Sequence, residues 1–540
     1  MYPGTHARTH PDKPAAIGVG TDGRVYGVLT YRQLNENSLR LAHVFADAGL
    51  RRGDVVGLLT DNRLEAFEVY WAALRSGLYF TAVNHHLATE EAEYILRDAG
   101  VKALVVSAGK AELAAAVRDA ASDGGAVVAL AYGGPVPGYD DYSAALAGAS
   151  TDPLPDQPRG SMMLYSSGTT GRPKGVRPPL SHRQVSEPGD PLVQLNHDVY
   201  GIDADTVYLS PAPIYHSAPV KWCHSVHAYG GTVVMMERFD AEGALRAIDE
   251  QHVTHAQFVP TMLIRILKLD PAVRARYDTS SLRVAVHAAA PCPVEVKQAI
   301  IAEWGPVVWE YYGSTESLGV TIIDSAQALA KPGSVGRPVL GVLHICDSDS
   351  PAGDELPTGE VGTVYFERAE LLGKGGLPFR YHNDDERTKS AQHPAHPTWG
   401  TVGDLGYVDE DGYLFLTDRK AFLIISGGVN IYPQEVENVL ALHPAVHDVA
   451  VVGVPDAEMG ESVAAYVELP PGVDGSPELA AELRTFVRSR IAHYKAPRTV
   501  TFVDSLPRTP TGKLVKGRLG RLADDALDGL SRTGQTGHTV

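Results

Sequence analysis

The sequence predicts an α/β protein with a large N-terminal domain of two mainly parallel αβ subdomains and a small β-rich subdomain, followed by a small α+β C-terminal domain. Three observations lead to this prediction. The chain has 540 residues, and at about 150 residues per domain we expect roughly three or four packed units. Helical patterns alternate with short apolar runs through the first half of the chain. After that, the pattern changes to strands and turns and then back to α/β.

The alternation in the first half predicts βαβ units. Apolar residues at spacings of three and four mark one face of a helix, whereas short runs rich in Val and Leu are typical of buried parallel strands. Repeated units of this kind predict mainly parallel sheets. Helices are expected over 31–48 and 65–77, and strands over 54–59, 103–106, 206–211, 232–236 and 282–288.

A change of pattern between about 359 and 418 predicts a small antiparallel or barrel-like subdomain. Residues 362–366 form an apolar run, and an Asp411-Gly412 turn precedes a second run at 413–416. Asp-Gly between alternating apolar residues is a strong hairpin signal. The expected boundaries are therefore 1–419 for the N-terminal domain, with its β-rich subdomain at about 335–419, then 420–528 for the C-terminal domain and 529–540 for a disordered polar tail.

The composition argues against several classes of protein. The chain has 47 Lys and Arg against 65 Asp and Glu, a formal net charge of −18, so we expect no nucleic acid partner. The cysteines, Cys223, Cys292 and Cys346, are far apart and include no C-x-x-C, which fits a reducing, cytoplasmic setting. We find neither a signal peptide nor an apolar stretch of about 18 residues, and therefore expect no transmembrane segment.

The segment Gly18-Val19-Gly20-Thr21-Asp22-Gly23 matches the glycine pattern of a dinucleotide-binding turn. That turn must open a helix, but the run after Gly23 is β-like. We therefore interpret Asp22-Gly23 as a hairpin turn.

The strongest local motif is the loop Ser166-Ser167-Gly168-Thr169-Thr170-Gly171-Arg172-Pro173-Lys174-Gly175. Small hydroxyl residues and glycines allow backbone N–H groups to surround phosphate oxygens, and the lysine adds a mobile cation. Gly175 stands where a Walker loop has the hydroxyl that holds Mg²⁺. The motif therefore predicts phosphate binding but not a kinase or GTPase.

Four further motifs follow this loop in order: Glu310-Tyr311-Tyr312-Gly313-Ser314-Thr315-Glu316, Thr401-Val402-Gly403-Asp404 with Asp418-Arg419, Ser426-Gly427-Gly428, and Pro507-Arg508-Thr509-Pro510-Thr511-Gly512-Lys513. Together the five motifs resemble the adenylate-forming superfamily, and most of all its bacterial acyl-CoA synthetases that act on fatty or aryl acids. The resemblance extends over nearly the whole chain. It implies the α/β fold predicted above, with a C-terminal domain that rotates about Ala421.

The resemblance assigns roles that suit the chemistry of the residues. It implies nucleotide binding by the phosphate loop, by Glu310, Tyr311, Tyr312 and Gly313, by Ala289, Ala290 and Pro291, and by Asp404 and Arg419. Thr315 would contact the α-phosphate and Glu316 would hold Mg²⁺, for which a carboxylate is a suitable hard ligand. Lys513 would stabilise the charge that develops on the α-phosphorus. Gly427 and Gly428 would line the channel of the acceptor thiol.

The acid pocket is expected near His216, Lys221, Trp222, Val259 and His287. His216 would lie at the pocket mouth and take part in catalysis. Trp222 would close the pocket against a long alkyl tail and so favour an aryl or arylpropenoic acid, whereas Lys221 would be either a surface residue or the partner of a polar substrate end.

By this resemblance the enzyme would use ATP and Mg²⁺ to convert a carboxylic acid into acyl-AMP and then transfer the acyl group to coenzyme A. An alternative keeps the fold but changes the acceptor, as in amide formation or the nitrite-dependent diazotisation of an aromatic amine in secondary metabolism. A nucleotide-binding regulator without catalysis is a further alternative. The sequence also leaves open a homodimer.

Overall fold

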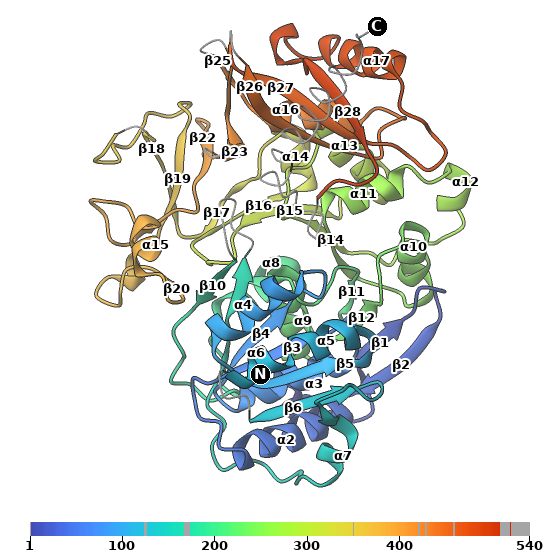
Figure 1. The fold of residues 1–540 in the computed structure, drawn as a ribbon, viewed down its shortest axis with the longest axis vertical. Coiled ribbons are helices and arrows are strands. Elements are labelled where there is room, and N and C mark those ends of the chain that lie inside the picture. Colours follow the sequence, from blue (N-terminus) through green and yellow to red (C-terminus); the bar gives the residue numbers. More distant parts are fainter. Residues whose placement is uncertain are drawn as a thin grey trace, which may run out of the picture.

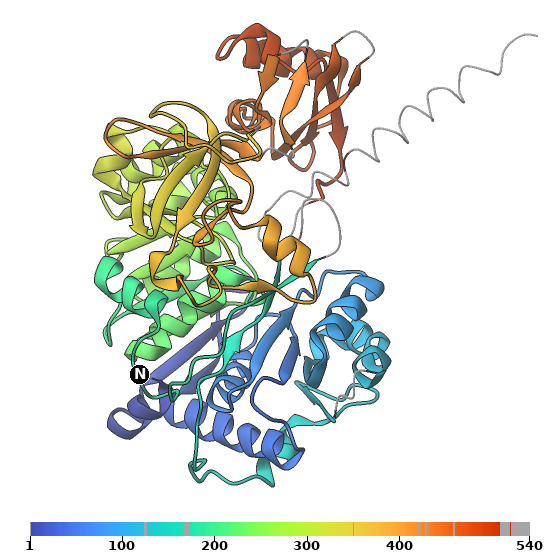
Figure 2. The same ribbon diagram turned by 90° about the vertical axis from the view of Figure 1, so that its left-hand side faces the viewer.

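The computed structural model describes residues 2–123, 127–166, 173–348, 350–419, 422–426, 429–456, 459–507 and 519. Five sheets are present in these ranges. Two large sheets form the N-terminal body. The C-terminal sheet lies at the end of the molecule that is farther from the first of these sheets (Figures 1 and 2). The predicted α/β class is confirmed.

The first large sheet is parallel throughout, in the order β7-β6-β5-β3-β4-β8. Its strands are β3 (Val55–Leu59), β4 (Tyr79–Val83), β5 (Val101–Ser107), β6 (Val128–Tyr132), β7 (Asp140–Asp141) and β8 (Ser161–Met162). Its helices are α2 (Tyr31–Asp47), α3 (Glu65–Arg75), α4 (Thr89–Ala99), α5 (Ala111–Ala116), α6 (Arg118–Asp123) and α7 (Tyr142–Ala147). The predicted helices over 31–48 and 65–77 are α2 and α3, shorter at their C-terminal ends by one and two residues.

The second large sheet has the order β17-β16-β15-β14-β13-β11-β12-β1-β2. The strands from β1 to β15 along this order are parallel, and the outer strands β2, β16 and β17 are antiparallel. Its strands are β1 (Pro14–Val19), β2 (Val25–Thr30), β11 (Val207–Ser210), β12 (Thr232–Met236), β13 (His255–Phe258), β14 (Val284–His287), β15 (Val308–Gly313), β16 (Val320–Asp324) and β17 (Arg337–Leu340). Its helices include α8 (Pro191–Tyr200), α9 (Ser217–Tyr229), α10 (Ala241–Glu250), α11 (Pro260–Leu267), α12 (Pro271–Arg274), α13 (Val294–Trp304) and α14 (Ser325–Ala330).

Helices α3 and α9 are buried on nearly every face. A helix with this burial lies inside a protein rather than on its surface. The indole Nε1 of Trp71 on α3 donates to His227 Nδ1 on α9 over 3.2 Å, and one core contains residues of both large sheets. The two sheets therefore hold α9 in a fixed position, which matters for the site below.

The β-rich subdomain is antiparallel, as predicted. It consists of β18 (Val342–Cys346), β19 (Gly362–Glu367), β21 (Trp399–Gly400), β22 (Asp404–Val408) and β23 (Leu414–Arg419). Gly412 adopts φ +80° in the predicted β22–β23 turn. A separate three-stranded sheet joins β9 (Leu164–Ser166), β10 (Lys174–Arg177) and β20 (Arg380–Tyr381), with α15 (Asp385–Ser390) after it.

The C-terminal sheet has a core of its own. It contains β24 (Ile424–Ser426), β25 (Val429–Ile431), β26 (Asp448–Asp456), β27 (Gly460–Glu468) and β28 (Thr499–Val503), packed against α16 (Pro433–Ala441) and α17 (Pro477–Arg488). Lys268, just after α11, donates from Nζ to the carbonyl of Val446 over 2.6 Å, and Leu442 packs on the core of the second large sheet. These contacts place the C-terminal sheet beside α11 (Figure 1).

Asp22 and Gly23 lie in the hairpin turn that joins β1 to β2, with Gly23 at φ +79°, as the sequence predicts. Within the ranges that the structure describes, no helix is both long enough and apolar enough to cross a membrane.

Candidate functional site

The site lies at the carboxyl ends of four neighbouring parallel strands, β11, β13, β14 and β15. In open α/β sheets ligands bind in the crevice at this edge, because the loops that follow the strands converge there. The loops here carry His216, Val259, Ala289 and the segment Gly313–Glu316. The fold therefore brings together four stretches that the sequence analysis selected separately.

The phosphate loop begins and ends on paired strands. Ser166 on β9 lies opposite Lys174 on β10 in an antiparallel pair, so the strand ends on either side of the loop lie next to each other. Lys174 Nζ lies 5.0 Å from the centre of the Tyr381 ring, within the range of a cation–π contact. The predicted residues Ser167, Gly168, Thr169, Thr170 and Gly171 lie outside the described residues.

Glu316 is fixed by a tyrosine that the sequence analysis missed. Tyr381 on β20 donates from Oη to Glu316 Oε1 over 2.8 Å, and both residues are buried. Since the same ring contacts Lys174, Tyr381 connects the predicted metal carboxylate with the base of the phosphate loop. Tyr381 and Glu316 lie far apart in the sequence and share no local pattern. Their contact is visible only in the fold, in which β20, the strand of Tyr381, pairs with β10.

Tyr312 and Asp404 form the predicted nucleoside side of the site. Tyr312 donates from Oη to Asp404 Oδ2 over 2.7 Å. Asp404 on β22 lies opposite Arg419 on β23. The register therefore places Asp404, the predicted ribose-binding residue, beside the backbone of Arg419, which is also predicted to contact the nucleotide.

Glu310 and Tyr311, both predicted to bind the nucleotide, make contacts with other parts of the protein. Neighbouring residues of a strand point to opposite faces, so Tyr311 points away from Tyr312. Its hydroxyl accepts a hydrogen bond from Gln257 Nε2 over 2.8 Å, and burial raises the pKa of Tyr311 to about 12. Glu310 forms a buried ion pair with Lys297. Burial raises the pKa of Glu310, while the ammonium group of Lys297 opposes the shift. The Glu310 carboxylate is therefore engaged in the core, whereas Tyr311 is half-buried beside Gln257.

The loop after β14 combines a buried histidine with strained backbone. His287 is fully buried, and burial, with the positive charge of Lys297, holds its pKa well below the usual range, so the ring is neutral. Ala289 adopts φ +75°, a left-handed conformation that non-glycine residues rarely adopt, and it is exposed together with Pro291. Such strain is concentrated at functional sites. His287 thus supports the loop from behind, whereas Ala289, Ala290 and Pro291 are accessible.

Lys221 is half-buried and contacts the loop that follows β15. Its Nζ donates to the carbonyl of Thr315 over 3.3 Å and to Ser317 Oγ over 3.1 Å. Burial lowers the pKa of Lys221 to about 8, and the carboxylates of Glu316 and Asp190 oppose that shift. The ammonium group therefore holds the loop that carries Thr315 and Glu316.

The predicted pocket wall is only partly accessible. His216 is the residue before α9 and packs its ring 4.4 Å from that of Tyr215. Val259 is buried before α11. Trp222 is buried, and its ring stacks on that of Tyr208.

Besides the residues of the phosphate loop, four other predicted residues lie outside the described residues: Lys513, Gly427, Gly428 and Ala421. The Arg419 side chain is likewise not described, although its backbone belongs to β23.

Two family models match the chain. The model described as AMP-binding enzyme matches residues 4–374, and the model described as AMP-binding enzyme C-terminal domain matches residues 435–513.

Characterised relatives match over almost the entire length. The chain is 34% identical over 527 residues to the fatty acid–[acyl-carrier-protein] ligase ScoC of Streptomyces coeruleorubidus, covering 95% of this chain and 94% of that protein. It is 33% identical over 527 residues to a feruloyl-CoA synthase of Amycolatopsis sp, covering 96% and 98%. Among solved structures, the amide bond synthetase McbA of Marinactinospora thermotolerans matches with a TM-score of 0.75 and 29% identity, covering 96% of this chain and 99% of that one.

Proposed function

Because the chain belongs to the AMP-binding enzyme family and is an AMP-forming acid ligase, we propose that it activates an aryl or fatty acid and transfers the acyl group to coenzyme A. An oxygen of the acid carboxylate attacks the α-phosphorus of ATP, and pyrophosphate leaves. The thiol then attacks the acyl carbon, loses its proton, and AMP leaves. The observation that supports the proposal is that Tyr381 connects Glu316 with Lys174, while Tyr312, four residues before Glu316, donates to Asp404.

These residues and their neighbours would contact successive parts of ATP, from the phosphates to the base. Lys174 at the base of the phosphate loop would neutralise the leaving pyrophosphate. Thr315 would contact the α-phosphate, and Asp404 would accept hydrogen bonds from the ribose hydroxyls, which are stronger to a charged acceptor than to a neutral one. Tyr312, whose hydroxyl already contacts Asp404, would present its ring to the base.

The donor set fits Mg²⁺ held jointly by protein and nucleotide. In the described part of the chain no group of three or more His, Cys, Asp or Glu residues forms a closed metal site. Mg²⁺ is commonly bound by one or two carboxylates together with substrate phosphates. Glu316, oriented by Tyr381, would supply the carboxylate, and the bound metal would neutralise phosphate charge.

We further propose that Lys513 acts in adenylation and that Gly427 and Gly428 serve thioester formation, with rotation at Ala421 between the two steps. A placed ammonium group stabilises the pentavalent centre more than the ground state. The separate core of the C-terminal sheet and its docking through Lys268 and Val446 support the idea that this sheet moves as a unit.

A second candidate function is amide formation, because the amide bond synthetase structure matches nearly the whole chain. The two functions share the adenylation step and differ in the acceptor.

The test is a mass-spectrometric screen with ATP and Mg²⁺ over aliphatic, aryl and arylpropenoic acids. Each acid is assayed alone, with coenzyme A, with an amine, and, for aminoaryl acids, with nitrite. We expect AMP and an acyl-CoA. An amide in the amine arm, or AMP release that depends on nitrite without any thioester, would instead assign the alternative acceptor chemistry.

A further inference from the structure

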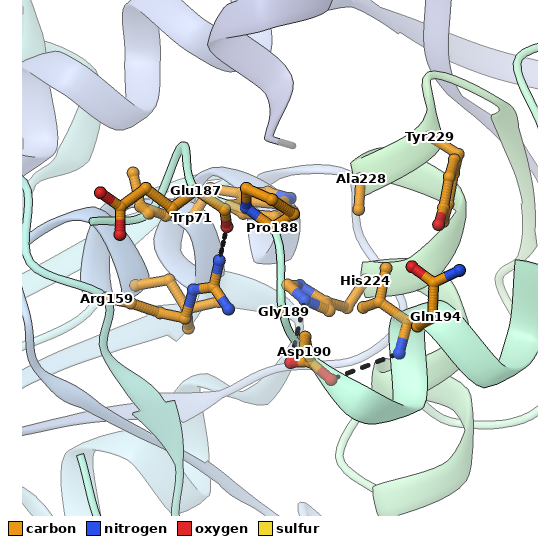
Figure 3. A pocket seen from close by; sticks show the side chains of 13 residues that line it. Trp71, Arg159, Glu187, Pro188, Gly189, Asp190, Gln194, His224, Ala228 and Tyr229 are labelled. Atoms are coloured by element: carbon orange, nitrogen blue, oxygen red, sulfur yellow. Dashed lines mark hydrogen bonds and ion pairs between the residues drawn. The ribbon is translucent and has the colours of Figure 1, made fainter. Parts of the chain in front are cut away.

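Two pockets differ in their relation to the five motifs. The pocket between α3, the segment 185–190, α8 and α9 is lined by no motif residue among those that the structure describes (Figure 3). A larger cavity of about 190 Å³ lies between α4, β10, β20 and α15, and Asp98, Lys174 and Tyr381 are among its lining residues. Groups beside a cavity lack packing contacts on that side. Hydrogen bonds to neighbouring elements therefore matter more for the position of Lys174.

Asp98, near the C-terminal end of α4, accepts hydrogen bonds from two separate segments beside this cavity. Tyr165 on β9 donates from Oη to Asp98 Oδ2 over 2.5 Å. Asn383, two residues after β20, donates from Nδ2 to Asp98 Oδ1 over 3.2 Å. The carbonyl of Asp98 also accepts from His382 Nε2 over 2.9 Å. A helix of the first large sheet is thus joined to β9 and to the segment after β20 through one residue.

The ring of His382 is a donor toward Asp98. Burial and the positive charge of Arg177 lower the pKa of His382, so the ring is neutral. Arg177 Nη1 lies 3.2 Å from His382 Nδ1, and because a guanidinium can only donate, Nδ1 is the acceptor nitrogen. The ring hydrogen is therefore on Nε2, where it is donated to the Asp98 carbonyl.

Both segments that contact Asp98 also meet the backbone of Gly175. Tyr165 lies opposite Gly175 in the pairing of β9 with β10, and the backbone N–H of His382 donates to the Gly175 carbonyl over 2.7 Å. A Cβ atom at position 175 would lie 2.9 Å from Tyr165 Cζ and 3.1 Å from His382 Cβ, so glycine permits this close approach. Since Gly175 directly follows Lys174, a shift of either segment would move the base of the phosphate loop.

The segment after β20 also leads to Glu316. Tyr381, two residues before Asn383, donates to the Glu316 carboxylate. Asn383 adopts φ +54°, a left-handed conformation that is uncommon for residues other than glycine. Such a conformation persists only where the surrounding structure holds it. The hydrogen bonds from Asn383 Nδ2 to the carboxylate and the carbonyl of Asp98 hold this turn directly after Tyr381.

We propose that Asp98 is a positioning residue that fixes Lys174 and Glu316 relative to each other. It acts through Tyr165 and the segment 381–383. The inference rests on the proposed function, in which Lys174 neutralises phosphate charge and Glu316 supplies a carboxylate to Mg²⁺. If the two groups are displaced from each other, the nucleotide and its metal ion cannot contact both at once. The expected effect is therefore on the metal dependence of ATP binding.

The test measures ATP binding by calorimetry over a range of Mg²⁺ concentrations, together with the urea unfolding of each full-length protein. Asp98→Ala should raise the Mg²⁺ concentration for half-maximal ATP binding about five- to tenfold. In Asp98→Asn the amide oxygen can accept from Asn383 and the amide nitrogen can donate to the Tyr165 hydroxyl, so the value should return to within about twofold of the wild type. Equal losses in both variants would assign the effect to the charge of Asp98 and overturn the proposal.

Two further variants separate positioning from stability. Asn383→Gly removes the contact with Asp98 but suits φ +54°, so the Mg²⁺ requirement should rise while the free energy of unfolding changes little. Tyr165→Phe should also raise the requirement. The control Tyr139→Phe should not, because the Tyr139 hydroxyl donates to the carbonyl of Ala114 on α5 over 2.8 Å. An unchanged requirement in Asn383→Gly and Tyr165→Phe, or a rise only in variants that lose stability, would overturn the proposal.

The double variant Asp98→Ala/Tyr381→Phe tests the route to Glu316. Because Asp98 is proposed to act partly through Tyr381, the combined rise in the Mg²⁺ requirement should be smaller than the product of the two single effects. A rise equal to that product would show that the two residues act independently and would overturn the route.

These binding measurements do not depend on the acid or the acceptor. If the wild type binds ATP with Mg²⁺ but no acid yields AMP, the proposed function is wrong, and the variants still decide the role of Asp98. If the wild type binds no ATP, the proposed function and the positioning role are both wrong.

Discussion

Removing one partner of the buried pair between Lys297 and Glu310 should lower stability without lowering ATP affinity. The two side chains are only 7% and 5% exposed. The nearby His287 is neutral, so it does not supply a positive charge for Glu310 when Lys297 is removed. Breaking a buried ion pair from one side typically costs about 3–5 kcal/mol, because the remaining charge stays buried without a counter-ion.

The magnitude differs for the two single variants. Lys297→Met leaves the Glu310 carboxylate without its ammonium partner, and we expect a loss of about 3–5 kcal/mol. Glu310→Gln leaves the ammonium group with the carbonyl of Ser334 at 3.4 Å, so its loss should lie at the lower end of that range. The double variant Lys297→Met/Glu310→Leu removes both charges and should recover to within about 1–2 kcal/mol of the wild type.

Urea unfolding of the four proteins measures these differences, and ATP titration by calorimetry measures nucleotide affinity in each. If Glu310 is structural, Glu310→Gln weakens the fold and changes the ATP dissociation constant by less than about threefold. A loss of ATP affinity of tenfold or more in a variant of unchanged stability would restore Glu310 to the nucleotide site and refute the reasoning from the structure.

Further predictions concern the site and the pH dependence of stability. Tyr381→Phe frees Glu316 from its hydrogen bond, so the Mg²⁺ concentration for half-maximal ATP binding, measured by calorimetry, should rise several-fold, whereas ATP binding without metal should not change. Lys513→Ala should slow adenylation by at least about 100-fold, while thioester formation from preformed acyl-AMP is largely retained; normal pyrophosphate exchange would exclude the role. Asp404→Asn removes the charged acceptor and should weaken ATP binding by about tenfold, a loss that 2′,3′-dideoxy-ATP should not show. Burial raises the pKa of Glu68 to about 7, so its contribution to stability is fully present below pH 4.5 and is lost as the pH rises through 7. The free energy of unfolding of Glu68→Gln should therefore exceed that of the wild type at pH 8 by up to about 3 kcal/mol and by less at pH 5. Parallel curves of unfolding free energy against pH for the two proteins would contradict the raised pKa.

Elements with a clear period were predictable from the sequence. The strand expected over 232–236 is β12 with the same bounds, and the hairpin at Gly23 was predicted because no helix follows the glycines. Side-chain direction was not predictable for the motif that starts at Glu310. Its pattern names four neighbouring residues, 310–313, as part of a nucleotide site, but a strand sends alternate side chains to opposite faces. Only the partner of Tyr311, Gln257, and the partner of Tyr312, Asp404, show which face is which.

The same limit applies to the loop that carries Thr315 and Glu316. Ser317 adopts φ +56°, a conformation that costs about 1–3 kcal/mol for a non-glycine residue. Arg368 Nη1 donates to the carbonyl of Ser317 over 3.0 Å, Lys221 holds Thr315, and Tyr381 holds Glu316.

These three donors come from the segment after β19, from α9 and from β20, and none belongs to the motif that they position. A motif can therefore state which residues act on the nucleotide, but the precision with which Glu316 is placed depends on distant elements that hold a strained loop from separate sides. Because each donor fixes a different residue of the loop, loss of any one should displace the carboxylate without unfolding the sheet. For this reason we expect the Tyr381 variant to change metal dependence before it changes stability.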